Sequence, residues 1–355
     1  MKGIILHGGH GTRLRPLTHT GPKQLLPIAN KPMSEYCIES IKEAGIKDIA
    51  IIIGGIGSNK VKEYYGTGEK FGLCFTYIEQ DSPKGIAHAI QLCKEFVKNE
   101  KFLVFLGDNI IQKSIREFAL KFEESNFDAT VLLCKVDNPS RFGIASVTNG
   151  KITKIIEKPK NSSSDLAVTG IYFLTSKIFK IIDNLKPSWR NELEITDALD
   201  ILLEKNNNLS YEIITDYWKD TGTPEDIINA NGQLIEKMNE YFFGNKENNV
   251  SINGKVIVGK NSLIKSNVII NGPVIIGENC LINSGTIIGP NVSIGNNSTV
   301  SKCNVVNTII MENCKINLNM NIYNSIISNN SEIISDNKLN NEKVFLLGEG
   351  TKIFF

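Results

Sequence analysis

Apolar residues in the first part of the chain fall into short unbroken runs, which amphipathic stretches separate. Such a run, bounded by polar residues or glycine, is typical of a strand buried on both faces of a parallel sheet. The predicted strands are 3–6, 49–53, 73–78 and 102–106. Apolar residues at helical spacing predict helices between these strands, over 34–44, 60–65 and 86–97. This alternation predicts an α/β sheet that is largely parallel and binds its ligands beyond the carboxyl ends of the strands.

The pattern then becomes more β-like, and two helices follow. The predicted strands are 130–136, 143–147, 152–156 and 167–174. One helix is predicted over 189–205. The next begins at Thr223, whose hydroxyl suits an N-cap before a proline, and ends near residue 240. A polar linker over 244–249 closes a first domain that is predicted to span residues 1–243.

Beyond the linker, aliphatic residues recur every six positions. The repeating positions are Val258, Ile264, Ile270, Ile276, Ile282, Ile288, Ile294, Val300 and Val306. A period of six is typical of a parallel β-helix in which each repeat forms one side of a triangular coil and the aliphatic side chain points inward. After Val306 the phase shifts, first to Ile310, Ile316 and Ile322, and then to Ile327 and Ile333. We therefore predict a left-handed β-helix from about 250 to 340, with a looser tail, as a second domain over 250–355.

Composition and charge exclude several classes of protein function. The chain has 355 residues, of which 41% are hydrophobic and 22% charged, as in an ordinary globular protein of two domains or one large one. A formal net charge of +1 gives no basic field for nucleic acid or a membrane surface. The sequence shows no membrane span and no signal peptide, so we expect a cytoplasmic protein. The seven cysteines form no C-x-x-C pair, which argues against a zinc site or a disulfide framework.

A glycine-rich turn follows the first strand, and cations follow the turn. Gly8, Gly9 and Gly11 lie within four positions, where backbone amides without side chains in the way can surround an anion. The cations that come next are Arg13, Arg15 and Lys23. A strand that leads into a glycine-rich turn and then into spaced cations is suited to binding a polyphosphate. The turn is not a Walker A loop, which needs a Lys-Ser/Thr pair, nor a dinucleotide fingerprint, because Leu14 stands where that motif has glycine.

The longer string G-G-x-G-T-R-L-x-P-L-T, followed by P-K-x-L-L-P-I-x-N-K-P-M, resembles the signature of the sugar-1-phosphate nucleotidylyltransferases. The rest of the chain extends the resemblance, in order, through LGDN, EKP, ELEITDA, WKDTGTPED and the hexapeptide tail. Together these motifs resemble the long form of the thymidylyltransferase branch of this family, which has a C-terminal β-helix. It implies a Rossmann-like nucleotidyltransferase domain with a mainly parallel sheet, followed by a C-terminal left-handed parallel β-helix. It also implies that a nucleoside triphosphate, with dTTP favoured, reacts with glucose 1-phosphate to give a nucleotide sugar and pyrophosphate.

The resemblance assigns roles to individual residues. Asp108 and Asp220 would hold Mg²⁺. Without the resemblance, Asp108 would be interpreted as part of a turn at a strand end, and Asp220 as a residue that caps a helix. Arg13, Lys23 and Lys158 would act in catalysis by stabilising the phosphates. The residues implied to bind the nucleotide are Leu6, Gly8, Gly9, Gly11, Thr12, Arg13, Gln24, Gln80, Gly85 and Asp108. The residues implied to bind the sugar phosphate are Gly143, Glu157, Lys158, and the turn of Val168, Thr169 and Gly170.

Several alternatives stay open at this point. His7 departs from the alanine that is usual at its position, which leaves the base preference in doubt. UTP or N-acetylglucosamine 1-phosphate could be the substrate on the same scaffold, and a regulatory subunit of this fold would be non-catalytic. Some relatives carry an acetyltransferase on the β-helix with a histidine base. No histidine lies beyond His88, so we expect the β-helix to serve structure and assembly in a homo-oligomer.

Overall fold

The computed structural model describes residues 1–9, 11–206 and 208–334, apart from the side chain of Asn206. The internal contacts of the chain divide it into two compact units. The first, here called the sheet unit, comprises Met1–Gly11, Thr20–Leu25 and Met33–Asp220. The second, the β-helix unit, comprises Thr12–His19, Leu26–Pro32 and the chain from Thr221 onward. The predicted domain limits of 1–243 and 250–355 stay a prediction, and the predicted tail lies outside the described residues.

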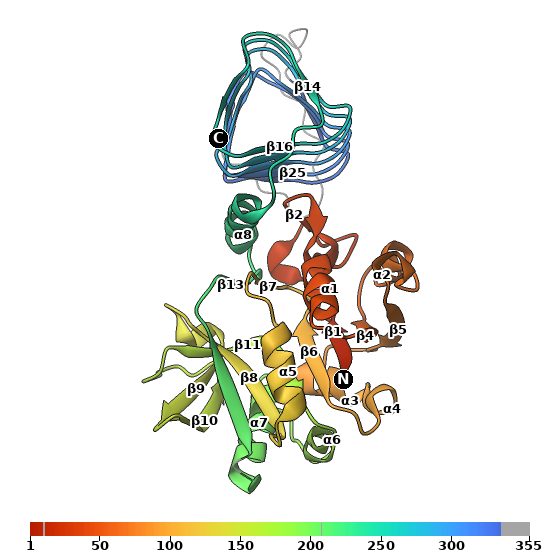
Figure 1. Ribbon diagram of the computed structural model, residues 1–355, viewed down its shortest axis with the longest axis vertical. Coiled ribbons are helices and arrows are strands. Elements are labelled where there is room, and N and C mark those ends of the chain that lie inside the picture. The colour runs from red at the N-terminus through yellow and green to blue at the C-terminus, as the bar shows by residue number, and fades with distance from the viewer. Residues whose placement is uncertain (10, 207, 335–355) are drawn as a thin grey trace. The chain divides into compact units, whose positions relative to one another are not determined.

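The sheet unit is built on a nine-stranded sheet (Figure 1). Its main path runs β10-β9-β11-β6-β1-β4-β5, and β8 joins β11 to β12. Strands β6, β1, β4 and β5 pair in parallel, as the buried apolar runs predict. The bounds are β1 (Lys2–Leu6), β4 (Asp48–Ile53), β5 (Cys74–Glu79), β6 (Phe102–Leu106), β8 (Ala129–Lys135), β9 (Gly143–Thr148), β10 (Lys151–Glu157), β11 (Leu166–Leu174) and β12 (Leu209–Ile214).

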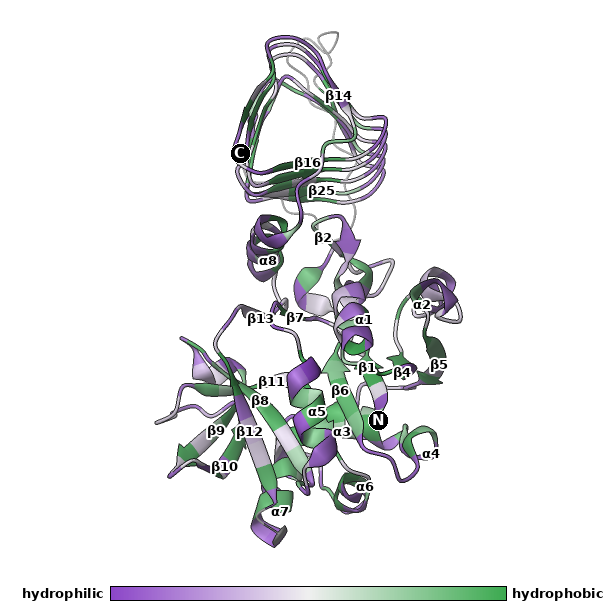
Figure 2. Cartoon of the chain, viewed as in Figure 1, coloured by the Kyte–Doolittle hydropathy of each residue, from purple (hydrophilic) through white to green (hydrophobic). Residues whose placement is uncertain are grey.

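Helices cover this sheet, whose central strands are largely hydrophobic along their length (Figure 2). Every residue of β4 after Asp48 is buried, so the strand has no solvent face. Two hydrophobic clusters lie on the two sides of the sheet, because alternate residues of β1 point to opposite faces. The helices of this unit are α1 (Met33–Glu43), α2 (Asn59–Tyr65), α3 (Ile86–Gln91), α4 (Lys94–Val97), α5 (Arg116–Glu124), α6 (Lys177–Ile182) and α7 (Ile195–Asn206). Short 3-10 turns are η2 (Lys23–Leu25), η3 (Glu69–Phe71) and η4 (Pro139–Arg141).

Three local predictions for this unit are wrong. The helix predicted over 86–97 is two short helices, α3 and α4, which separate at Leu92 and Cys93. The helix predicted over 189–205 begins only at Ile195, because the preceding residues form a turn in which Asn191 N–H donates to the Ser188 carbonyl. Val168, Thr169 and Gly170 do not form a turn. They lie inside β11, where its pairing with β8 shifts register.

A small two-stranded ribbon in the same unit joins distant parts of the sequence. Strand β7 (Asn109–Ile111) pairs antiparallel with β13 (Trp218–Asp220). In this register Asp220 lies opposite Asn109, directly after Asp108 in the chain. The ribbon therefore brings the LGDN and WKD motifs together, as two acidic residues with a shared role require.

The β-helix unit has three parallel sheets, as the six-residue period predicts. The first sheet consists of β14 (Asn245–Lys246), β17 (Leu263–Ile264), β20 (Leu281–Ile282), β23 (Thr299–Ser301), β26 (Lys315–Asn317) and β29 (Glu332–Ile334). The second sheet consists of β15 (Ser251–Asn253), β18 (Ile269–Asn271), β21 (Ile287–Ile288), β24 (Asn304–Val306) and β27 (Asn321–Tyr323). The third sheet consists of β16 (Val256–Val258), β19 (Val274–Ile276), β22 (Val292–Ile294), β25 (Thr308–Ile310) and β28 (Ile326–Ile327). Their inward aliphatic side chains form one continuous core. This arrangement agrees with the left-handed β-helix predicted from the sequence.

A ladder of asparagines stabilises one corner of the coil. Asn261 Nδ2 donates to Asn279 Oδ1 at 3.2 Å, and the same bond continues to Asn297 and Asn313 at 3.3 and 3.2 Å. All four have positive φ angles between 54° and 58°, a conformation that asparagine tolerates better than most residues. The partners are 18 residues apart in the first two steps and 16 in the third. The third of these coils is therefore two residues shorter than the first two.

This shortening explains the shift in the phase of the repeat. One consequence is that Val305, not the predicted Val306, points into the core. Ile310 and Ile316 are again buried, so their predicted phase is confirmed. Ile333 keeps the predicted phase, because it pairs in register with the buried Ile316, although it is 39% exposed in β29. The six-residue count is wrong wherever a corner loses a residue.

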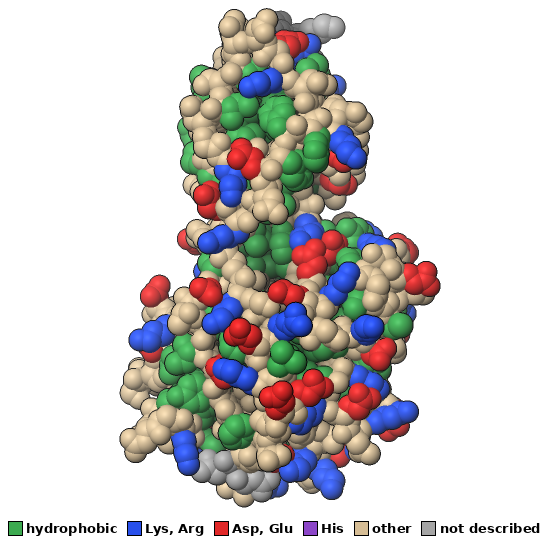
Figure 3. All heavy atoms as spheres, in the orientation of Figure 1, with side chains coloured by type: hydrophobic (Ala, Val, Ile, Leu, Met, Phe, Trp, Pro, Cys, Tyr) green, Lys and Arg blue, Asp and Glu red, His purple; other side chains and the backbone are tan. Residues whose placement is uncertain are grey.

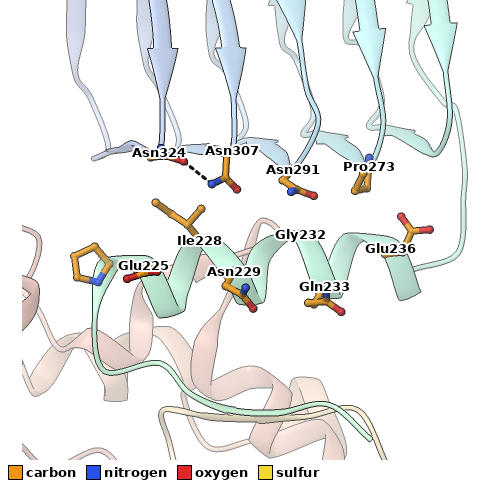
Figure 4. Close-up of a pocket in the computed structure, with 11 residues that line it drawn as sticks. Glu225, Ile228, Asn229, Gly232, Gln233, Glu236, Pro273, Asn291, Asn307 and Asn324 are labelled. Carbon is orange, nitrogen blue, oxygen red and sulfur yellow. Dashed lines mark hydrogen bonds between the residues drawn. The ribbon is translucent and has the colours of Figure 1, made fainter. Parts of the chain in front are cut away.

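The remaining elements of this unit precede the coil. They are η1 (Thr12–Leu14), β2 (Pro27–Ile28), β3 (Lys31–Pro32) and α8 (Pro224–Lys237). The predicted N-cap of α8 is confirmed, since Asp226 N–H donates to Thr223 Oγ1 at 3.2 Å, whereas the helix ends at Lys237 rather than near 240. A groove of about 750 Å³ lies between α8 and a corner of the coil, and Ile228 points toward Asn307 and Asn324 across it (Figure 4).

Three general observations complete the fold. Among the described residues, no helix is both long and apolar enough to span a membrane. The face in Figure 3 mixes basic and acidic side chains rather than gathering one sign of charge. All seven cysteines lie in described parts of the chain and are free thiols.

Candidate active site

The glycine-rich turn leaves β1 at the carboxyl end of the strand, where the sheet places its ligands. Gly9 and Gly11 have positive φ angles, so the backbone turns sharply after Leu6. Two glutamines flank Gly8. Gln24 Nε2 donates to the Gly8 carbonyl at 3.3 Å, and Gln80 Oε1 lies 3.0 Å from the point where a Cβ of residue 8 would be. Three of the predicted nucleotide-binding residues are therefore neighbours.

Asp108 follows β6 at the same end of the sheet and forms an ion pair with Lys23. The side chains are largely buried, with 12% of Lys23 and 19% of Asp108 exposed. Burial alone would raise the pKa of Asp108, but the Lys23 charge and hydrogen bonds from Lys23 and Asn109 outweigh it and hold the pKa below the usual value. Asp108 is therefore an anion at neutral pH.

Asn109 connects the parts of this site, although no local pattern distinguishes it from the other residues of its motif. Its Nδ2 donates to Asp108 Oδ1 at 2.9 Å. Its Oδ1 accepts from Trp218 Nε1 at 2.8 Å and from the Gly170 N–H at 3.3 Å. The side chain is 2% exposed, so these bonds replace water that burial removed. One amide thereby fixes Asp108, the irregular part of β11 and the strand that carries Asp220.

Asp108 and Asp220 have the chemistry of a magnesium site. Asp220 lies opposite Asn109 in the β7–β13 ribbon, and Trp218 in the same strand packs edge-on against Phe142 at 5.6 Å. In the parts of the chain that the structure describes, no cluster of three or more His, Cys, Asp or Glu residues could hold a metal ion. Two carboxylates still fit Mg²⁺, which typically binds one or two of them and completes its shell with water and substrate phosphates.

Gln80 and Gly85 lie on either side of the loop that joins β5 to α3. Gln80 Nε2 donates to the Gly85 carbonyl at 3.3 Å and contacts His88 Nδ1 at 3.0 Å. Gly85 has a φ angle of 100°, and a Cβ there would lie 2.4 Å from the Leu193 carbonyl oxygen. Only glycine suits this position. The backbone of Leu193 also donates to Lys84 and accepts from Ala87, so the ELEITDA segment fixes the loop.

Three of the predicted sugar-phosphate residues lie together at the end of β10. Glu157 Oε2 accepts from Thr196 Oγ1 at 3.0 Å, and its other oxygen lies 3.6 Å from Arg190 Nη1 and 3.6 Å from Lys158 Nζ. Gly143 packs against the same group, because a Cβ there would lie 3.1 Å from Glu157 Oε2. The structure thus groups Gly143, Glu157 and Lys158.

Lys158 has an unusual backbone conformation. Its φ angle of 43° lies in the left-handed region, which costs a non-glycine residue of the order of 1–3 kcal/mol. Its N–H donates to the Phe142 carbonyl at 3.0 Å, which ties the end of β10 to the start of β9. Strain of this kind is common at functional sites. Here the backbone conformation determines the direction in which the lysine side chain leaves the end of β10.

Thr12 and Arg13 are not grouped with the residues above. They lie in η1, which belongs to the β-helix unit, so their predicted roles stay predictions. Within β11, Thr169 is fully buried and its hydroxyl has no hydrogen-bond partner in the described parts of the chain, and Val168 is 6% exposed. These two residues support the strand beside Gly170, and their predicted contact with the sugar also stays a prediction.

Sequence reasoning missed Asn109, Arg190 and Thr196 as parts of the site. Arg190 Nη1 lies 3.1 Å from Glu194 and 3.6 Å from Glu157, and so neutralises two acidic groups. A partial signal was present, because Asn109 belongs to LGDN, and Glu194 and Thr196 belong to ELEITDA. A motif gives the order of residues along the chain, but it does not show which side chains turn toward one another in the fold.

His7 is buried directly after β1, with 1% of its surface exposed. Neither ring nitrogen has a hydrogen-bond partner among the described residues, and the ring packs edge-on against Tyr65 at 6.1 Å. Burial lowers the pKa of His7 to about 3, although Asp108 acts in the opposite direction. His7 is thus a neutral group behind the glycine turn, and it does not add to the positive charge for phosphate.

Comparison with known proteins identifies the family to which the chain belongs. The nucleotidyl transferase family model matches residues 2–237, and the model of the GMPPB C-terminal domain matches residues 270–353. The low-salt glycan biosynthesis nucleotidyltransferase Agl11 of Haloferax volcanii is 42% identical over 263 residues, which is 74% of each chain. A glucose-1-phosphate thymidylyltransferase of Streptomyces antibioticus is 39% identical over 266 residues, again 74% of each. A bifunctional protein GlmU of Methanococcus maripaludis is 39% identical over 75% of this chain and 62% of its own.

Solved structures lead to the same result. A protein assigned as a glucose-1-phosphate thymidylyltransferase from Bacillus anthracis is 44% identical, with a TM-score of 0.64 over 68% of this chain and 98% of that one. A UDP-glucose pyrophosphorylase in complex with UDP-glucose is 28% identical, with a TM-score of 0.60 over 67% of this chain and 99% of that one. The resemblance and the fold class that the sequence motifs indicate are confirmed. The chain belongs to the nucleotidyl transferase family and is a sugar-1-phosphate nucleotidyltransferase.

Proposed function

We propose that this enzyme transfers a thymidylyl group from dTTP to glucose 1-phosphate and releases pyrophosphate. Relatives that are named glucose-1-phosphate thymidylyltransferases support this choice, including one from Neisseria meningitidis that is 40% identical over 234 residues. The observation that carries the proposal is the buried Lys23–Asp108 pair, which Asn109 connects to the strand of Asp220. Such a set of charges suits the alignment of two mutually repelling anions.

The reaction needs no protein base. A phosphate oxygen of glucose 1-phosphate attacks the α-phosphorus of dTTP and forms a new P–O bond. The bond between that phosphorus and the bridging oxygen breaks, and pyrophosphate leaves with the electron pair. Because the attacking oxygen is already an anion at neutral pH, catalysis consists of alignment and charge neutralisation.

The cations of the site would supply that neutralisation. We assign Lys23 and Arg13 to the phosphates of dTTP, where an ammonium and a guanidinium stabilise the departing pyrophosphate. Lys158 would bind the sugar phosphate, and Glu157 would accept hydrogen bonds from sugar hydroxyls. Asp108 and Asp220 would hold a magnesium ion, which neutralises phosphate charge when it is bound. Removing either carboxylate would leave the phosphates to repel one another.

The nucleotide would lie along the glycine turn. Leu6, Gly8, Gly9, Gly11 and Thr12 would surround it with backbone amides and a small apolar surface. Gln24, Gln80 and Gly85 would lie at the base, and Gly143, Val168, Thr169 and Gly170 at the sugar. We further propose that the enzyme is a homo-oligomer.

A second candidate function uses UTP, or N-acetylglucosamine 1-phosphate, at the same site. The GlmU relatives and the UDP-glucose pyrophosphorylase structure favour it. A non-catalytic subunit of this fold would be expected to lose the charged residues, and here Arg13, Lys23, Asp108, Lys158 and Asp220 are all present.

The test is a panel of nucleoside triphosphates against several sugar 1-phosphates in Mg²⁺, with pyrophosphate release as the readout. We expect the highest kcat/KM for dTTP with glucose 1-phosphate, and one dTDP-glucose formed for each pyrophosphate. A higher kcat/KM with UTP and N-acetylglucosamine 1-phosphate would favour the second candidate. No turnover with any pair would reject both.

A further inference from the structure

We propose that His88 is a positioning residue that fixes which end of the Gln80 amide faces the nucleotide base, and thereby contributes to base selection. The inference rests on the proposed role of Gln80 in binding the base. His88 itself needs no contact with the substrate. It acts through its hydrogen bond with Gln80.

The orientation of the amide follows from its neighbours. The Gly85 carbonyl can only accept a hydrogen bond, so the Gln80 atom that lies 3.3 Å from it must be the nitrogen Nε2. The same nitrogen lies 3.0 Å from His88 Nδ1. The two hydrogens of Nε2 are therefore directed to Gly85 and His88. The oxygen, Oε1, is left on the side of Gly8, in the turn assigned to the nucleotide.

This arrangement requires a particular state of His88. Because Nε2 of Gln80 donates, His88 Nδ1 must accept, and the ring must be neutral with its proton on the other nitrogen. Burial and the nearby Lys84 lower the pKa of His88, and Asp81 opposes them less strongly, which favours the neutral ring. His88 lies one helical turn after Gly85 at the start of α3, and the contacts of Leu193 hold this loop in place. Gln80 is 7% exposed, so a misdirected amide would leave buried groups without partners.

An oxygen directed at the base selects for a hydrogen-bond donor. Thymine and uracil carry N3–H on their pairing edge, whereas cytosine has a bare N3 at the same position. The native amide therefore attracts the first two bases and repels cytosine at N3. If the amide could turn freely, its nitrogen would donate to cytosine N3, and discrimination would weaken.

The experiment compares kcat/KM for dTTP and dCTP in His88→Leu and His88→Asn. Leucine removes the acceptor. Asparagine can place its side-chain oxygen where Nδ1 lies in histidine and so restore it. We expect the preference for dTTP over dCTP to fall about tenfold in His88→Leu, the loss of roughly one hydrogen bond, and to return in His88→Asn. In a Gln80→Ala background, His88→Leu should leave the preference unchanged, because there is no amide to orient.

The outcomes separate the two proposals. If the wild-type protein turns over neither dTTP nor UTP, the proposed function fails before His88 is tested. If it turns over dTTP, and His88→Leu retains the wild-type preference, the inference about His88 is wrong. It is also wrong if His88→Leu lowers the preference equally with and without Gln80, because the effect would then be a general disturbance of the fold.

Discussion

The interior of the β-helix and the candidate active site of the sheet unit are both buried, but they are built by opposite rules. The β-helix core is mainly aliphatic, and each side chain contacts copies of its own position in the neighbouring coils. The active site buries Asn109 and Gln24, and largely buries Asp108, among hydrogen bonds that join distant segments. Asn109 and Trp218, for example, are 109 positions apart.

This difference affects what each region can tolerate. An aliphatic core loses stability in proportion to the volume that is removed, since packing is its main source of free energy. A buried polar site is fully satisfied only when every partner is present, so loss of one group affects the others. Mutations should therefore lower stability in the β-helix and activity in the sheet unit.

The largest effect is expected for Asp108→Asn. The substitution keeps the shape of the side chain and removes the charge opposite Lys23, so kcat/KM should fall by about 10³-fold in Mg²⁺ while the fold persists. Initial rates of pyrophosphate release, with circular dichroism as the folding control, provide the measurement. Asp48→Asn, at an exposed strand start of the same sheet, is the matched control and should keep the wild-type rate. A near wild-type rate for Asp108→Asn would remove this residue from the site.

A pair of neighbouring isoleucines tests the other region. Ile288 is fully buried in the β-helix, whereas Ile287 beside it is 37% exposed. Ile288→Ala should lower the free energy of unfolding by about 2–5 kcal/mol, and Ile287→Ala by about 1 kcal/mol or less. Urea titration followed by circular dichroism measures both. Equal losses would show that the six-residue period does not determine which side chains carry the core.

The third prediction concerns the residue that connects the site. Asn109→Leu removes the hydrogen bonds to Asp108, Trp218 and Gly170 at nearly constant volume, and should lower kcat/KM by about 10–100-fold through loss of alignment. Steady-state rates over a range of Mg²⁺ concentrations should show a raised requirement for the ion. Asn99→Leu, in an exposed turn, serves as the control. An unchanged Mg²⁺ requirement would mean that Asn109 does not position Asp108.

The smallest expected effect is on substrate affinity. Lys158→Ala removes one charged contact to the sugar phosphate, which should raise the KM for glucose 1-phosphate about tenfold and leave the KM for dTTP nearly unchanged. Lys154→Ala, in the strand β10 that ends just before Lys158, changes an exposed lysine paired with Asp200 and should alter neither KM. If the KM for dTTP rises more than that for the sugar phosphate, Lys158 belongs to the other substrate.

The same contrast explains how far the sequence predicts the structure. The β-helix is predictable because its rule is local, and Ile264, Ile276 and Ile294 are buried as the period requires. The prediction is wrong only where a corner loses a residue, as at Val305. The parallel strands of the sheet follow from their unbroken apolar runs.

The active site is predictable only in part. Glycines and charges indicate a phosphate site, and the motifs indicate the family. The bonds of Asn109 and Thr196 depend on which segments the fold brings together, and no local pattern encodes that. Thr12 and Arg13 belong to the second unit for the same reason, because the contacts that define a unit join segments that are distant in the sequence.

The most direct test of the account is a double-mutant cycle on Asp108 and Asp220, measured as kcat for pyrophosphate release at saturating substrates and varied Mg²⁺. If the two carboxylates hold one ion, each single change to asparagine should cost about 10³-fold, and the double change should cost little more than either one. Losses that multiply, or a near wild-type rate for Asp220→Asn, would contradict a shared magnesium site and the charge-alignment mechanism that depends on it.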